Sequence, residues 1–73
     1  MHTRLPIERH DLLQLLNWEL AAYEECEGCR FTAIMADDEG RGWNASLEGG
    51  AVTGQMIARQ VIAETRRAFN VQR

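Results

Sequence analysis

The sequence predicts an α+β fold, a small single domain spanning residues 1–73 in which two helices flank a β-hairpin. Apolar residues recur with helical spacing before residue 26 and after residue 53, whereas residues 29–48 hold two runs with strand spacing on either side of a Gly-rich turn. The order is α-β-β-α, or α-β-β-β-α if Ala51-Val52-Thr53 forms a third strand. We expect two antiparallel helices packed on one face of the antiparallel hairpin.

The first helix is expected at about 8–26, after a short lead-in. Leu12, Leu16 and Leu20 fall on one stripe at about 100° per residue. Gly28 then suits the left-handed position that ends many helices. The apolar surface continues through four more residues, Leu15, Trp18, Ala22 and Cys26. The arc covers roughly 200°, about twice what a surface helix needs, which predicts a second partner for this helix.

The two strands are expected at about 29–36 and 43–48. Strict alternation in the second strand directs three residues inward, Trp43, Ala45 and Leu47. In the first strand the same rule places three residues on one face, Phe31, Ala33 and Met35. The acidic turn Asp37-Asp38-Glu39 lacks the spaced ligands of a calcium-binding EF-hand, so a solvated turn is expected there.

The second helix is expected at about 53–70, with Thr53 as its N-cap. Seven residues form its apolar stripe: Ile57, Ala58, Val61, Ile62, Thr65, Ala68 and Phe69. Polar residues surround this stripe, so the segment is amphipathic with the width that a surface helix requires.

Composition excludes several classes of protein. The chain has 73 residues, of which 45% are apolar, but no apolar run approaches the roughly 18 residues that cross a bilayer. The first residues lack the apolar segment of a signal peptide, so we expect a cytoplasmic protein with no membrane partner. All eight basic residues are Arg, and the net charge is −3. An acidic balance disfavours a general nucleic-acid binder. The size and the Arg-only basic composition are similar to those of small accessory proteins of bacteria or their phages.

Cys26 and Cys29 are the weak candidates for a metal site. A lone C-x-x-C supplies half of the four ligands that structural zinc needs, so a zinc site would have to be shared by two subunits. As a redox pair the motif is badly placed, because it ends a helix among Glu24, Glu25 and Glu27, whose charges raise a thiol pKa. We therefore expect structural thiols with no metal and no cofactor, with zinc binding and redox chemistry as the alternatives.

A nucleic-acid interface is an alternative that depends on the third strand. The order α-β-β-β-α resembles that of double-stranded-RNA-binding domains in topology only, because the Lys-rich helix start of those domains is replaced by a segment, 54–59, with one basic residue. Four residues would contact phosphate in this reading: Arg59, Arg66, Arg67 and Arg73.

The sequence favours a small non-catalytic interaction or adaptor module that forms a homodimer. The expected interface is the uncovered side of the first helix, with four residues, Leu15, Trp18, Glu19 and Ala22. Glu19 is either a buried acid suited to proton transfer or a rim carboxylate paired with an Arg; the second reading is favoured because no nucleophile–base set accompanies it. A further protein partner is expected without an identity. The alternative function is a nucleic-acid-binding or zinc-dependent binding protein.

Overall fold

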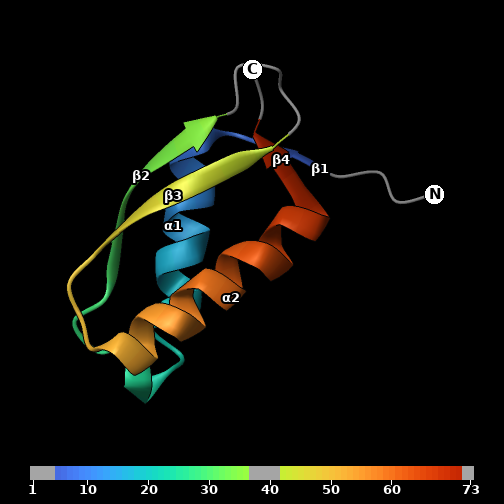
Figure 1. Cartoon of the computed structure of the whole chain (residues 1–73). Helices are drawn as coiled ribbons and strands as arrows, with labels where there is room; N and C mark the ends of the chain where they lie inside the picture. The colour runs from blue at the N-terminus through green and yellow to red at the C-terminus, as the bar shows by residue number, and fades with distance from the viewer. Residues whose placement is uncertain (1–4, 37–41, 72–73) are drawn as a thin grey trace.

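The chain folds into two helices, an antiparallel hairpin and a second pair of short parallel strands (Figure 1). The structure is a computed structural model that describes residues 5–36 and 42–71. Its elements, in chain order, are β1 (Leu5–Ile7), α1 (Arg9–Leu20), the 3-10 turn η1 (Glu24–Cys26), β2 (Arg30–Ala36), β3 (Trp43–Glu48), α2 (Val52–Ala68) and β4 (Phe69–Val71). The acidic turn at 37–39 and Arg73 lie outside the described residues.

The predicted order α-β-β-α is corrected by the parallel pair β1–β4. Leu5 pairs with Phe69 and Ile7 with Val71, so the two ends of the described chain meet (Figure 1). Pro6 lies in β1, where an edge strand tolerates its missing N–H. Phe69 was expected on the helical stripe but begins β4, because α2 ends at Ala68.

The helix expected to reach residue 26 ends at Leu20 instead. Residues Glu24–Cys26 form a separate 3-10 turn, and Gly28 follows that turn with φ +84°. A continuous helix would have gathered Glu24, Glu25 and Glu27 at its C-terminus, where the helix dipole repels negative charge. The break instead places Glu24 and Glu25 at the start of a new turn, where negative charge is tolerated.

The prediction that Phe31, Ala33 and Met35 share one face is wrong, because β2 contains a bulge. The pairing of β2 with β3 shifts register between Phe31 and Ala33. One residue is therefore inserted into the alternation, and Phe31 and Ile34 are buried while Ala33 and Met35 are exposed. In β3 the alternation holds: Trp43 and Ala45 are buried and Leu47 packs against the core.

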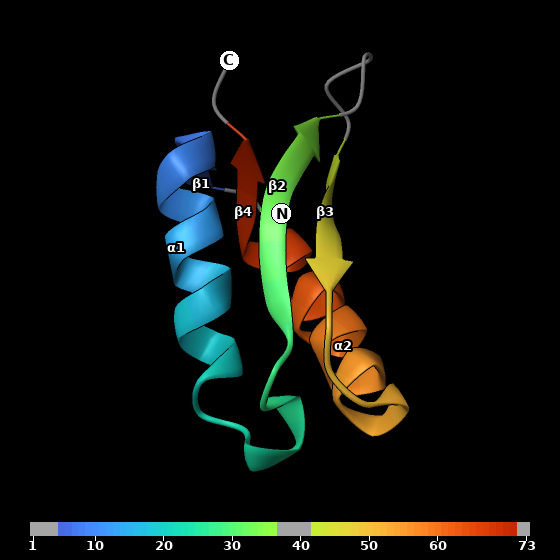
Figure 2. The same cartoon turned by 90° about the vertical axis from the view of Figure 1, so that its left-hand side faces the viewer.

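The core joins both helices to the hairpin strands. α1 contacts β2 and α2, while α2 also contacts η1, β3 and β4 (Figure 2). The Cα radius of gyration is 12.0 Å, close to the roughly 11 Å of a compact chain of this length. The buried apolar residues are Leu12, Leu16, Leu20, Cys26, Phe31, Ile34, Trp43, Ala45, Ala58, Val61 and Ile62.

Asn17 fastens α1 to the outer edge of β2. Its side-chain amide donates to the Phe31 carbonyl at 3.1 Å and accepts from the Phe31 N–H at 2.8 Å. The Asn17 side-chain amide thus makes the two hydrogen bonds that the backbone of a neighbouring strand would make with Phe31. The Phe31 side chain is fully buried, so this link fixes the register between helix and strand at the centre of the core.

The start of α2 lies against the Cys26–Cys29 turn. Ala51, rather than Thr53, is the N-cap residue, and Val52 and Thr53 belong to the helix, so the third-strand alternative is wrong. Gly54 is buried, and a Cβ built on it would collide with the Glu25 carbonyl oxygen and lie 3.1 Å from the Cys26 Cα. Only a glycine allows the two backbones to approach this closely. Within the described ranges, no helix has both the length and the apolar character needed to cross a bilayer.

Gly54→Ala is expected to destabilise the fold. The substitution gains about 1 kcal/mol of helix propensity, but overpacking against backbone atoms costs about 1–3 kcal/mol, and neither Glu25 O nor Cys26 Cα is the end of a flexible side chain. Urea unfolding followed by circular dichroism measures the difference. Gln60→Ala, at an exposed position of the same helix, is the matched control and should change stability by less than about 0.5 kcal/mol. A Gly54→Ala variant as stable as the wild type would contradict the close approach.

Candidate functional site

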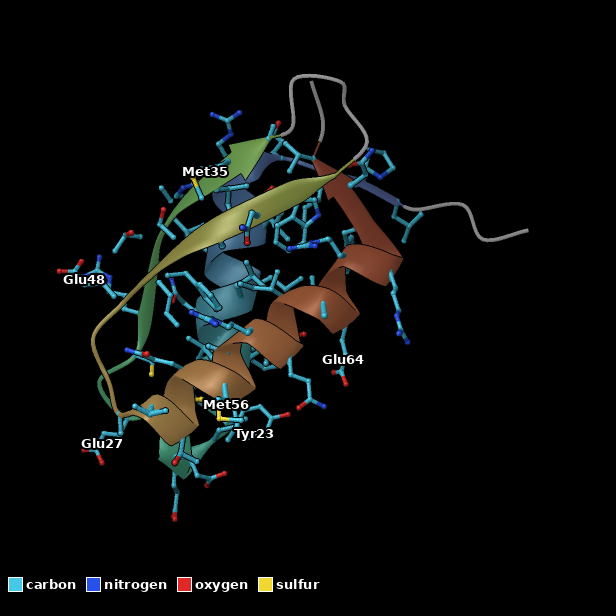
Figure 3. All side chains as sticks on the ribbon, in the orientation of Figure 1. Tyr23, Glu27, Met35, Glu48, Met56 and Glu64 are labelled. Atoms are coloured by element: carbon cyan, nitrogen blue, oxygen red, sulfur yellow. The ribbon has the colours of Figure 1, made fainter. Side chains whose placement is uncertain are left out.

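A hollow lies between the end of α1 and the middle of α2. Its volume is about 420 Å³, and it is lined by Trp18, Glu19, Ala21, Ala22, Tyr23, Val61 and Glu64. Figure 3 shows Glu64, which projects from α2, and Tyr23, which lies between α1 and η1, on the side of the molecule that faces away from the hairpin. The walls are mostly apolar with two carboxylates, which is a composition suited to contact with another apolar surface.

The structure brings three of the four predicted interface residues to this hollow. Trp18, Glu19 and Ala22 line it, whereas Leu15 is half-buried and does not. The Trp18 side chain is 75% exposed and Tyr23 is 42% exposed. The sequence analysis missed Ala21, Tyr23, Val61 and Glu64 as site residues. Tyr23 could have been predicted as a site residue from its apolar character. Val61 and Glu64 could not, because they reach the hollow only through the packing of α2 against α1.

Glu19 is half-buried and forms a bond that neither sequence interpretation included. Its Oε2 accepts a hydrogen bond from the Thr65 hydroxyl at 3.2 Å, and Thr65 is buried. Among the described residues, this carboxylate is therefore paired with a hydroxyl from α2, and an Arg partner across a subunit contact stays a prediction. The bond joins α1 to α2 beside the hollow and orients the carboxylate.

A second depression, the Arg groove, lies between β3 and the opposite side of α2. Its volume is about 580 Å³, and its lining residues are Asn44, Ala45, Leu47, Gln55, Arg59, Ile62, Ala63 and Arg66. Of the four residues of the nucleic-acid alternative, Arg59 and Arg66 meet here. Arg67 is exposed elsewhere on α2, outside the Arg groove. The lining contains no Asp or Glu from the described ranges, so the positive charge of the Arg groove is not neutralised by its own walls.

The Arg66 guanidinium is positioned by aromatic and amide contacts. It lies 5.8 Å from the centre of the Trp43 ring, within cation–π range. Its Nη2 donates to Asn44 Oδ1 at 3.5 Å, which is a long contact. Trp43 is itself fixed by a hydrogen bond from its Nε1 to the Phe69 carbonyl at 3.1 Å. The Nε of Arg66 is buried and has no acceptor among the described residues.

The two cysteines lie against the start of α2, near Gly54, and both are free thiols. Cys26 is only 3% exposed, and its Sγ donates to the Gly54 carbonyl at 3.4 Å. Burial raises the pKa of the Cys26 thiol, and the charges of Cys29 and Glu25 raise it further. This is the direction predicted for the motif. No cluster of three or more potential metal ligands occurs within residues 5–36 and 42–71.

The raised pKa of Cys26 predicts a loss of stability at alkaline pH. An unfolded thiol titrates near about pH 8.5, and the native pKa is higher, so the unfolded state releases its proton first as the pH rises. Stability from this group is therefore complete below about pH 8 and falls above it. In urea unfolding, the wild type should lose more stability between pH 7 and pH 10 than Cys26→Ala, which removes this titration. Equal losses in the two proteins would contradict the assignment.

Comparison of the chain with protein-family models, with curated proteins and with solved structures finds no match in any of the three.

Proposed function

We propose that the protein is a small non-catalytic interaction module that forms a homodimer through the hollow between α1 and α2. The observation that carries the proposal is the exposure of Trp18, which leaves 75% of an indole in water at the rim of a depression with apolar walls. Tryptophan and tyrosine are over-represented among residues that dominate binding energy. The hollow places both types next to each other.

A symmetric contact gives the exposed indole a binding site. In a two-fold dimer the same patch meets itself, so Trp18 of one protomer packs into the hollow of its partner and the reverse contact follows by symmetry. A large aromatic side chain can bury about 150–250 Å². Ala21 and Ala22 are small, and both line the hollow, so they allow close approach of a ring. A domain of this size also has a thin margin of stability, which association would increase.

The proposal includes the packing of both helices on one face of the hairpin. The buried strand residues Phe31, Ile34 and Trp43 belong to one core cluster with apolar residues of α1 and α2. On the opposite face Met35 is 48% exposed. With this arrangement the outer sides of the helices remain free for a partner.

We propose a protein without catalytic activity because the chain is short and because of the shape and lining of the hollow. An enzyme site usually encloses most of its ligand, and a chain of 73 residues has little material for such walls. Of the two carboxylates in the hollow, that of Glu19 already accepts a bond from Thr65. We place the module in the cytoplasm, where thiols stay reduced.

Cys26 and Cys29 are expected to be reduced and metal-free in the protein purified from a reducing compartment. Cys26 is held as a buried thiol that donates to the Gly54 carbonyl, whereas a zinc ligand must be a thiolate. Elemental analysis and thiol titration check this. About one zinc per two chains, removable only with loss of structure, would instead establish a four-cysteine site shared by two subunits.

Trp18→Glu is expected to convert the dimer into a folded monomer. Trp18 is exposed, so its replacement leaves the core intact and should change the stability of the fold by less than about 0.5 kcal/mol. A carboxylate placed in an apolar contact is unpaired and desolvated, which opposes association. Light scattering at about 100 µM should give twice the chain mass for the wild type and 8.3 kDa for the variant.

The matched control is Val52→Glu, which also replaces an exposed apolar residue by Glu but lies outside the hollow. It should keep the mass of the wild type. The proposed interface is wrong if the wild type is a monomer at this concentration, or if Trp18→Glu retains the dimer mass.

A further inference from the structure

The two outer edges of the hairpin differ in how they are covered. On β2, the Asn17 amide of α1 binds both the N–H and the carbonyl of Phe31, and so occupies that edge at this residue. On β3, the described residues contribute no pairing strand. Among the described residues, the Ala45 N–H there donates to Oδ1 of the Asn44 side chain of its own strand, at 2.9 Å. An open edge of this kind is a template for another strand.

The open edge of β3 forms one wall of the Arg groove. Asn44, Ala45 and Leu47 come from β3, and Arg59 and Arg66 come from α2 (Figures 1 and 2). A guanidinium carries five N–H donors. Among the described residues, the side-chain hydrogen bond of Arg66 goes to Asn44 and is long at 3.5 Å. N–H donors of Arg66 are therefore available to an acceptor on a ligand. They lie next to backbone groups of β3 that can pair with another strand.

We propose that this edge binds an extended acidic peptide segment of a partner protein by strand addition, with carboxylates of the peptide paired to Arg59 and Arg66. The proposal concerns the opposite side of α2 from the dimer contact and does not depend on it. Main-chain hydrogen bonds to β3 supply affinity, as in other sheets that bind a peptide strand. The two arginines supply the selectivity for acidic side chains.

The geometry sets the spacing of the acidic residues. Arg59 and Arg66 are seven residues apart on one side of the helix, which is about 10 Å along its axis, so one carboxylate does not reach both. Alternate residues of a strand point to the same side and are about 7 Å apart. Acidic residues at alternate positions can therefore each meet one flexible arginine side chain.

Asn44 occupies the edge until the peptide arrives. A peptide carbonyl that accepts from the Ala45 N–H takes the place of Asn44 Oδ1, since both occupy the same donor. The same Oδ1 is the acceptor of the long Arg66 contact, so its displacement also releases the guanidinium. The Nε of this Arg66 guanidinium is buried and lacks an acceptor among the described residues. Once released from Asn44, the guanidinium can turn toward a carboxylate of the peptide.

A peptide fits this site better than a nucleic acid does. The chain carries a net charge of −3, and only two arginines meet in the Arg groove, whereas phosphate-backbone binding relies on many cations. An open strand edge presents alternating N–H and C=O groups, which match another peptide backbone and not a sugar–phosphate chain.

The test uses fluorescence anisotropy at low salt with a labelled eight-residue peptide of alternating Glu and Val. Affinity should fall about tenfold when Gln replaces Glu in the peptide, because a charged pair is lost from each arginine. Arg59→Gln and Arg66→Gln should each weaken binding severalfold. Arg67→Gln, with the same charge change on the same helix, is the matched control and should bind as the wild type. If Arg66→Gln fails to fold because it leaves Trp43, the exposed Arg59 carries the test alone.

A peptide N-methylated at alternate residues separates strand addition from simple anion binding. Methylation of the set that faces β3 should abolish binding, and methylation of the other set should not. The proposal is overturned if the Gln–Val peptide binds equally well, if both methylated peptides bind like the parent, or if inorganic phosphate displaces the peptide at millimolar concentration. It is also overturned if a single-stranded oligonucleotide binds more tightly than the peptide, which would identify a nucleic-acid surface.

Discussion

The close backbone approach at Gly54 is the constraint on which the placement of α2 depends. At this point the helix lies against the Glu25 carbonyl and the Cys26 Cα, with no room for a Cβ between them. The Cys26 thiol donates to the Gly54 carbonyl and adds a polar link at the same contact. At the other end, the Trp43 indole donates to the Phe69 carbonyl, just after the helix. A helix fixed at both ends has a defined direction across the hairpin strands, and its two sides become two different surfaces.

Those two surfaces have opposite chemistry. On one side Val61 and Glu64 meet the end of α1, where Trp18 and Tyr23 give an apolar hollow with acidic residues. On the other side Arg59 and Arg66 face β3 and make a basic groove, although the chain as a whole carries a net charge of −3. The separation follows from helix geometry, since residues three or four apart share a side and residues two apart do not. The two contacts that we propose therefore use different residues of one small domain.

The elements predicted correctly are those whose signal is local. The hairpin strands and α2 were found close to their observed bounds, because alternation and helical periodicity are visible within one segment. The parallel pair β1–β4 was missed because each strand has three residues and its partner lies more than sixty residues away. The bulge after Phe31 was missed because one inserted residue changes the strand face without any mark in composition. The end of α1 was misplaced because the apolar residues Ala22 and Cys26 continue the helical spacing beyond Leu20, where the helix ends.

The sequence by itself determined the fold class, the periodic elements, and the excess of apolar surface on the first helix that includes Trp18 and Ala22. The upward shift of the Cys26 pKa comes first from burial, which only the tertiary structure provides, while its sequence neighbours Cys29 and Glu25 act in the same direction. The tertiary structure alone decided which residues of α2 complete each surface: Val61 and Glu64 at the hollow, Arg59 and Arg66 at the Arg groove. It also decided that Asn17 binds the outer edge of β2 at Phe31, whereas no strand of the described residues pairs with the outer edge of β3. The physical reason is that these contacts join residues far apart in sequence, and their partners are selected by packing at Gly54 and Phe31 rather than by any periodicity along the chain.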